Sequence, residues 1–270
     1  MTWLRTPALL AMLILVSGAA SAAAVLRVGS DISYAPLEFY APHSKQIQGF
    51  DYDLARAIGK KLGRPVQFVN HDFNSMMKSL NDGAFDVVVS AMSDTREREK
   101  LVDFVDYFFA GSGILVPKGN PAHIFNLAGL CGMTVDLQKG TAQEVLLKAQ
   151  SAECRAAGLG PIAILAFATD AQALNALLDG KSVAHISDYP VVAYLARTLG
   201  GGTRFEVGGR QFGVVPYGIA LPKHDTALRT AIQSALSSVV ADGSYDRILK
   251  KWSLGQGALR SAPINAGTLF

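Results

Sequence analysis

The feature that most limits what this chain can fold into is a regular alternation of short apolar strands with amphipathic helical patterns. Residues 26–30 (LRVGS) have the length and composition of a buried strand, and residues 50–62 place apolar side chains at four-residue spacing before Gly63. The stretch FDVVVS at residues 85–90 is apolar enough to be a strand covered on both faces. The alternation continues to Trp252 and predicts an α/β fold with mostly parallel sheets.

The alternation falls into two series, which predict two lobes with a cleft between them. Prolines and a glycine interrupt the chain at residues 114–121, and a glycine-rich span at residues 207–218 leads out of the second series. Open α/β sheets bind ligands beyond the carboxyl ends of their strands, so those ends are where functional residues are expected. The expected division is lobe 1 at residues 25–113, lobe 2 at residues 117–210, a return part of lobe 1 at residues 214–254, and a loose tail at residues 255–270.

Residues 1–23 have the pattern of a cleavable signal peptide. Arg5 gives a positive start, residues 9–16 form an almost continuous apolar run, and residues 21–23 are small, as at a cleavage site. A membrane anchor is the alternative, but the run is shorter than the ~20 apolar residues that a spanning helix needs. The sequence therefore predicts that the protein is exported and loses this segment by cleavage.

Charge and cysteine content exclude several classes of partner. The formal net charge is only +3, and no long basic run is present, which argues against nucleic-acid binding. The five histidines are scattered without ligand spacing, so we predict neither a metal nor a cofactor. Cys131 and Cys154 are the only cysteines, and an even count in an exported chain predicts one disulfide between them.

Polar side chains follow the valine-rich strand directly, in the stretch VVVSAMSDTRER at residues 87–98. A helix that begins there would offer free N–H groups and its dipole to an anion, Ser93 and Thr95 could add hydroxyl donors, and Arg98 has the planar fork that fits a carboxylate. The alternative is that Ser93, Asp94 or Thr95 only caps the helix while the side chains of Arg96 and Arg98 extend into solvent.

Two more strand ends carry polar groups that complement this arginine. Gly140, Thr141 and Gln143 stand at a predicted helix start, where they could bind the same ligand from the other lobe. Asp188 ends another strand and could accept an ammonium group, although it could equally cap the turn ahead of Pro190. Together, a cation for a carboxylate and a carboxylate for an ammonium predict a zwitterionic ligand such as a free α-amino acid.

At this point the sequence resembles the periplasmic amino-acid-binding proteins of ABC importers (family 3 solute-binding proteins), which include lysine/arginine/ornithine, histidine and glutamine binders. The resemblance covers nearly all of the mature chain, and the segments that carry it follow in the family's order. They are VGSDISYAPLEF, GFDYDLARAIGKKLG, FDVVVSAMSDTRER, VDFVDYF, QKGTAQE, ISDYPVVAYLA, PYGIALPK and DGSYDRILKKW. It implies an α/β, two-lobed periplasmic binding protein fold (type II), whose two extended crossovers act as a hinge.

The resemblance also implies roles for individual residues. Arg98 would bind the α-carboxylate, Asp188 the α-ammonium, and Tyr34 and Phe73 would enclose the ligand's side chain, unless these two rings are plain core. Asp31 and Asp51 could face the end of that side chain. The predicted ligand-binding residues are Asp31, Tyr34, Asp51, Phe73, Ser90, Ala91, Ser93, Arg98, Gln138, Thr141, Gln143 and Asp188.

The sequence thus predicts an exported, monomeric receptor that binds a polar or cationic L-amino acid and delivers it to an ABC importer permease in the inner membrane. It is not expected to be an enzyme. The alternative is an enzyme on the same scaffold, such as a cyclohexadienyl dehydratase, but no Ser-His-Asp, metal or phosphate-loop signature supports one. A sensory module that feeds a kinase would need a separate partner. Ala91, Ala142 and Ser187 depart from residues common in the family and leave the choice of ligand open.

Overall fold

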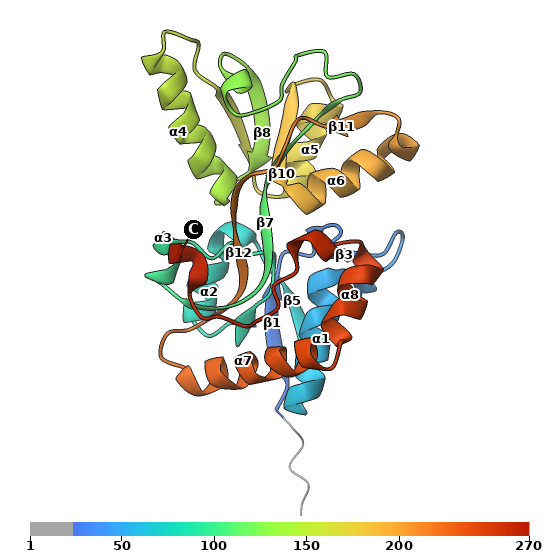
Figure 1. The fold of residues 1–270 in the computed structure, drawn as a ribbon, viewed down its shortest axis with the longest axis vertical. Coiled ribbons are helices and arrows are strands. Elements are labelled where there is room, and N and C mark those ends of the chain that lie inside the picture. The colour runs from blue at the N-terminus through green and yellow to red at the C-terminus, as the bar shows by residue number, and fades with distance from the viewer. Residues whose placement is uncertain (1–23, 270) are drawn as a thin grey trace, which may run out of the picture.

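The computed structural model describes residues 24–269, so the predicted signal peptide lies outside the described residues. The chain forms two lobes joined by two long strands that run between them (Figure 1). These crossover strands are β7 (Asp103–Pro117) and β12 (Phe212–Leu221). Among the described residues, no helix is both long enough and apolar enough to cross a membrane.

Lobe 1 consists of a sheet with helices packed on it and a small separate sheet. The sheet has the order β5-β1-β6-β12-β7, with β1 (Leu26–Ser30) parallel to β5 (Val66–Asn70) and β6 (Val87–Val88). Its helices are α1 (Phe50–Leu62), α2 (Met76–Asn81), α3 (Arg96–Glu99), α7 (Thr226–Ala241) and α8 (Ser244–Trp252). The small sheet is formed by β2 (Ser33–Tyr34), β3 (Glu38–Tyr40) and β4 (Ile47–Gln48).

Lobe 2 continues from β7 in the order β7-β10-β8-β9, and β11 also pairs with β7. Its strands are β8 (Thr134–Gln138), β9 (Ala163–Phe167), β10 (Ala184–Asp188) and β11 (Phe205–Val207). Its helices are α4 (Ala142–Ala156), α5 (Asp170–Leu178) and α6 (Tyr189–Thr198). The sheets are mixed and not mostly parallel as predicted, because β7 and β12 run antiparallel to their neighbours.

Each lobe has its own hydrophobic core, and the pairing of the two crossover strands becomes irregular between the lobes. The main core of lobe 1 lies between its sheet and helices α1, α7 and α8, whereas that of lobe 2 lies between its strands and α4. The pairing of β7 with β12 shifts register between Phe212 and Val215, next to Gly213 with a φ of 59°. A side chain at Gly111 would lie 2.6 Å from the carbonyl oxygen of Phe212, so only glycine fits there.

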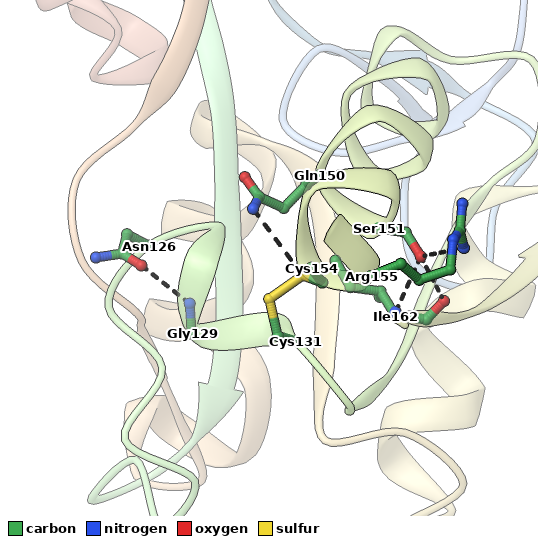
Figure 2. Close-up of a disulfide and its surroundings, with 8 residues drawn as sticks. All are labelled: Asn126, Gly129, Cys131, Gln150, Ser151, Cys154, Arg155 and Ile162. Carbon is green, nitrogen blue, oxygen red and sulfur yellow. Dashed lines mark hydrogen bonds between the residues drawn. A yellow bond between two sulfur atoms is a disulfide. The ribbon is translucent and has the colours of Figure 1, made fainter. Parts of the chain in front are cut away.

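The predicted disulfide between Cys131 and Cys154 is confirmed and lies within lobe 2 (Figure 2). It joins the turn that precedes β8 to the last turns of α4, with the two Cα atoms 5.5 Å apart. The cysteines are separated by 23 residues in the chain. Closing a loop of that length restricts the unfolded chain and contributes about 3 kcal/mol in the chain-entropy treatment.

Residues 255–269 of the C-terminal tail are not loose, which corrects the prediction of a loose tail for the part of residues 255–270 that the structure describes. Residues 258–267, here called the C-terminal strap, run along the edge of β7 in lobe 1. Phe108 and Ala258 form a bridge, as do Val105 and Ile264, and the amide of Asp106 donates to the carbonyl of Pro263 at 2.9 Å. The strap shows no strand periodicity because it pairs with β7 through isolated bridges and not through a continuous ladder.

Candidate ligand-binding site

The carboxyl ends of the strands in both lobes converge on one pocket between the lobes. All of the predicted ligand-binding residues except Asp51 line it, together with Glu38 and Ala142. The free volume left between these side chains is about 10 Å³, close to that of a single buried water. The lobes therefore lie close together here, and a larger molecule enters only when they separate.

Arg98 is buried in this pocket and does not extend into solvent. Thr95 caps α3 by accepting a hydrogen bond from the amide of Arg98, and that turn directs the guanidinium into the cleft. The guanidinium donates to the carbonyl of Ser93 at 2.9 Å and to the carbonyl of Gly140 in lobe 2 at 3.1 Å, and lies over the ring of Phe73. Each of the two interpretations of residues 87–98 therefore holds in part. Thr95 caps the helix, and Arg98 lines the pocket.

The charge of Arg98 persists at neutral pH. Burial lowers the pKa of its guanidinium to about 10, while the nearby carboxylates of Asp188 and Asp94 oppose that change. Both recorded acceptors of the side chain are neutral backbone carbonyls, of Ser93 and Gly140. A carboxylate that reached this position would be a stronger acceptor than either carbonyl.

Asp188 provides the opposite charge on the lobe 2 side. It ends β10 and precedes α6, but its side chain makes no capping hydrogen bond, so the capping alternative does not apply. Its carboxylate accepts from the hydroxyl of Tyr34 at 2.8 Å and from the amide of Gln143 at 2.7 Å, both neutral donors. Burial raises the pKa of Asp188 to about 6, although these hydrogen bonds hold it down. An ammonium group would stabilise this carboxylate further.

A buried polar network fixes the strand that carries Asp188. His185 lies between Asp136, at 2.6 Å, and Asp170, at 3.4 Å. Burial alone would lower the pKa of this histidine, but the two carboxylates raise it to about 10, so it is protonated. Asp170 also accepts a hydrogen bond from Ser187 at 2.8 Å. The residue before Asp188 is thereby held in place from within lobe 2.

Asp31 and Glu38 add two carboxyl groups from lobe 1. Asp31 accepts from the side-chain amide of Gln138 at 2.7 Å and from the hydroxyl of Ser33, and burial raises its pKa. Glu38 accepts from the hydroxyl of Ser90 at 2.7 Å, and burial together with the charge of Asp51 raises its pKa well above the usual range. The pocket lining thus contains three carboxyl groups and one guanidinium.

Asp51 lies behind the pocket and not in it, unlike the expectation that it faces the ligand's side chain. Its carboxylate accepts from the amide of Ala91 at 2.7 Å and from the hydroxyl of Tyr107 at 2.7 Å, and the side chain is fully buried. Ala91 has a φ of 43°, a left-handed conformation that is strained for alanine. Asp51 therefore holds the backbone of a pocket residue in place.

Three direct contacts connect the two lobes across the pocket. The hydroxyl of Tyr34 pairs with Ser187 and Asp188, the amide of Gln138 with Asp31, and the guanidinium of Arg98 with the carbonyl of Gly140. Each contact uses at least one side chain that was predicted to bind the ligand. A ligand that binds these groups must replace the contacts they make with each other.

Glu38 is the pocket residue that sequence reasoning missed. It belongs to β3, and the strands of that small sheet are two or three residues long, which is too short for a recognisable period. The available signal was a charged residue inside the apolar stretch YAPLEFY, at residues 34–40. Ala142, the other addition, presents only its methyl group and the first turn of α4.

Known proteins match this chain over most of its length. The family model "Bacterial extracellular solute-binding proteins, family 3" matches residues 26–256. The chain is 33% identical over 242 residues to the "Arginine-binding protein ArgT" of Corynebacterium glutamicum, covering 89% of this chain and 78% of the relative.

Solved structures of amino-acid-binding proteins also match this chain. "An ancestral arginine-binding protein bound to glutamine" is 37% identical with a TM-score of 0.76, over 85% of this chain and 98% of that one. An ancestral amino acid-binding protein described as a precursor of cyclohexadienyl dehydratase is 34% identical with a TM-score of 0.75, over 84% of this chain and 95% of that one. These matches confirm the predicted two-lobed fold class.

Proposed function

Because this chain belongs to the bacterial extracellular solute-binding proteins of family 3, we propose that it binds a free L-amino acid with a cationic side chain, L-arginine above all, in the pocket between its lobes. It then delivers the amino acid to the permease of an ABC importer. The arginine-binding relative supports this choice. The glutamine in the ancestral structure makes an uncharged amide the competing ligand.

The observation that carries the proposal is the balance of charge in the pocket. The α-carboxylate of the ligand pairs with Arg98 and its α-ammonium with Asp188, which leaves Asp31 and the Glu38–Asp51 pair without a cation. A cationic side chain supplies the missing charge, whereas an acidic one would meet like charge in a desolvated site. Calorimetric titration with arginine, lysine, histidine, glutamine and glutamate tests this, and tight binding of glutamate would contradict it.

The selectivity is expected to depend on Asp31. Replacing Asp31 by asparagine removes a charge but keeps a hydrogen-bond acceptor, so L-arginine binding should weaken by about 1.5–3 kcal/mol, or about tenfold to a hundredfold. Glutamine binding should change by less than about threefold, because an uncharged amide forms no ion pair with the carboxylate and so loses less when the charge is removed. Titration of both ligands against both proteins measures this. Equal losses for the two ligands would show that Asp31 acts only through its turn contact with Ser33.

The affinity for L-arginine is expected to fall as the pH drops below about 6. The pKa of Asp188 is about 6, raised by burial, and a bound ammonium lowers it. Binding therefore releases a proton below this pH, and the affinity is fully present above it and declines by up to about tenfold per pH unit below it. Titrations between pH 5 and 8 measure the slope. An affinity that stays constant down to pH 5 would exclude Asp188 as the ammonium acceptor.

We also propose that the chain catalyses no reaction, although its resemblance to a dehydratase precursor keeps that alternative open. Glu38 lines the pocket, and burial raises its pKa well above the usual range, but its carboxyl group already accepts a hydrogen bond from the hydroxyl of Ser90. A carboxyl group held in this way is poorly placed to protonate a leaving group. Turnover of a cyclohexadienyl substrate by the purified protein would overturn this proposal.

The family and the pattern of residues 1–23 support export to the periplasm, where the protein would act as a monomer. The permease would bind the protein with its lobes closed on the ligand, since closure is the change that reports occupancy. Transport of labelled L-arginine by cells with and without the gene tests this delivery step directly.

A further inference from the structure

The C-terminal strap ends beside α3, the helix that carries Arg98 (Figure 1). It follows the edge of β7 that β12 leaves free in lobe 1, and Asn265 holds it by pairing with both the amide and the carbonyl of Phe104. The family match ends at residue 256, so the strap lies outside the part of the chain that defines the family. Its contacts are features of this chain in their own right.

The strap bonds to a pair of buried carboxyl groups. The backbone amide of Gly267 donates to Asp94 at 2.9 Å, and that of Ala266 donates to Asp106 at 3.0 Å. Asp94 and Asp106 are both fully buried, and within the described part of the chain one carboxyl oxygen of each has no hydrogen-bond partner. Burial raises the pKa of each carboxyl group, so the backbone donors of the strap are important to both. Without the strap, both would lose their backbone donors.

Asp94 stands directly in the segment that forms the arginine end of the pocket. It follows Ser93, whose carbonyl accepts from the guanidinium of Arg98, and its own amide donates to the carbonyl of Pro216 at 2.8 Å. Gly267 packs against this backbone so closely that an added Cβ would lie 2.3 Å from the carbonyl oxygen of Asp94. The strap therefore limits where Ser93 and Arg98 can sit.

We propose that the C-terminal strap is part of the ligand-binding machinery: through Asp94 and Asp106 it positions Ser93 and Arg98 for the carboxylate of the ligand. Gly267 and Asp94 are positioning residues, since neither lines the pocket. This inference rests on the proposed function, because it assigns the strap to the carboxylate end of an amino-acid site. It predicts that disturbing the strap affects recognition of the carboxylate and not of the side chain.

The test compares L-arginine with L-argininamide, which lacks the carboxylate. In Gly267→Ala, whose Cβ must displace the Asp94 backbone, L-arginine binding should weaken by about tenfold while L-argininamide binding changes by less than about twofold. Gly255→Ala is the matched control in the same region, because a Cβ there meets nothing within 4 Å, and both affinities should be unchanged. Calorimetry at 20 °C, with folding verified by circular dichroism, gives the affinities of the wild type and both variants for each ligand.

A second pair of variants covers the case in which Gly267→Ala does not fold. Asp94→Ala removes the acceptor for the Gly267 amide and should reproduce the selective loss of L-arginine binding. Asp94→Asn keeps an acceptor and can donate to Asp106, so it should bind L-arginine within about twofold of wild type. An unchanged ratio of the two affinities in Gly267→Ala and Asp94→Ala would overturn the inference. A wild type that binds no amino acid would instead refute the proposed function.

Discussion

Replacing Arg98 by lysine is expected to weaken L-arginine binding by about a thousandfold and leave the fold intact. The guanidinium can offer two parallel N–H groups to a carboxylate, whereas an ammonium offers one point of contact. Two charge-assisted hydrogen bonds in a desolvated site are worth about 3–6 kcal/mol, and a lysine recovers part of that. Calorimetry measures the loss, and thermal unfolding shows whether the variant is folded.

The matched control is Arg96→Lys, two residues earlier on the same helix. Arg96 is exposed, while Arg98 is 8% exposed and faces the pocket. The control should bind L-arginine like the wild type, because its side chain does not reach the ligand. Equal affinities for Arg98→Lys and Arg96→Lys would remove Arg98 from the site and with it the proposed orientation of the ligand.

Replacing Asp51 by alanine is expected to lower the free energy of unfolding by about 4 kcal/mol. The carboxylate is the acceptor for two buried donors, the amide of Ala91 and the hydroxyl of Tyr107. Leaving a buried donor unsatisfied costs about 1–3 kcal/mol, and here both lose their partner. The left-handed backbone of Ala91 also loses the group that holds it. Urea denaturation followed by circular dichroism at pH 7 gives the difference.

Asp53→Ala, on the same helix, is the control for this substitution. Asp53 accepts from Lys251 and Trp252 near the surface, and loss of such partly exposed contacts should cost about 1 kcal/mol or less. If the two variants lose equal stability, the cost comes from removing an acidic side chain from the first turn of α1 and not from leaving buried donors without a partner. L-arginine binding by folded Asp51→Ala should also weaken, because Ala91 lines the pocket.

The sequence best predicted which residues line the pocket at the points where strands end. Arg98 and Asp188 could be placed in the pocket because open α/β sheets bring the carboxyl ends of their strands to one cleft. Asp188 ends β10, and Arg98 lies in α3, the first helix after β6. The disulfide followed from the even cysteine count together with the predicted export of the chain. These inferences need only local pattern and a general rule of topology.

Features that depend on side-chain direction or on non-local pairing could not be predicted. Asp51 lies in the first turn of α1, whose phase directs its side chain toward Ala91, and no pattern within α1 reveals what lies opposite. Glu38 lies in strands too short to show alternation. The strap pairs with β7, more than 140 residues earlier in the chain, through backbone groups that every residue possesses.

The contacts across the pocket compete with the ligand for the same side chains. Tyr34 with Asp188, Asp31 with Gln138, and Arg98 with Gly140 already join the lobes, so the affinity for a ligand measures an exchange of partners. A molecule with a single charged end replaces one contact, and the others must break without compensation. In the proposed orientation of the ligand, a molecule must offer a carboxylate, an ammonium and a polar side chain at once to replace them all. The affinity for a solute therefore depends on how many of these groups it presents together. A fragment of an amino acid is expected to bind weakly even where its one charged end binds well.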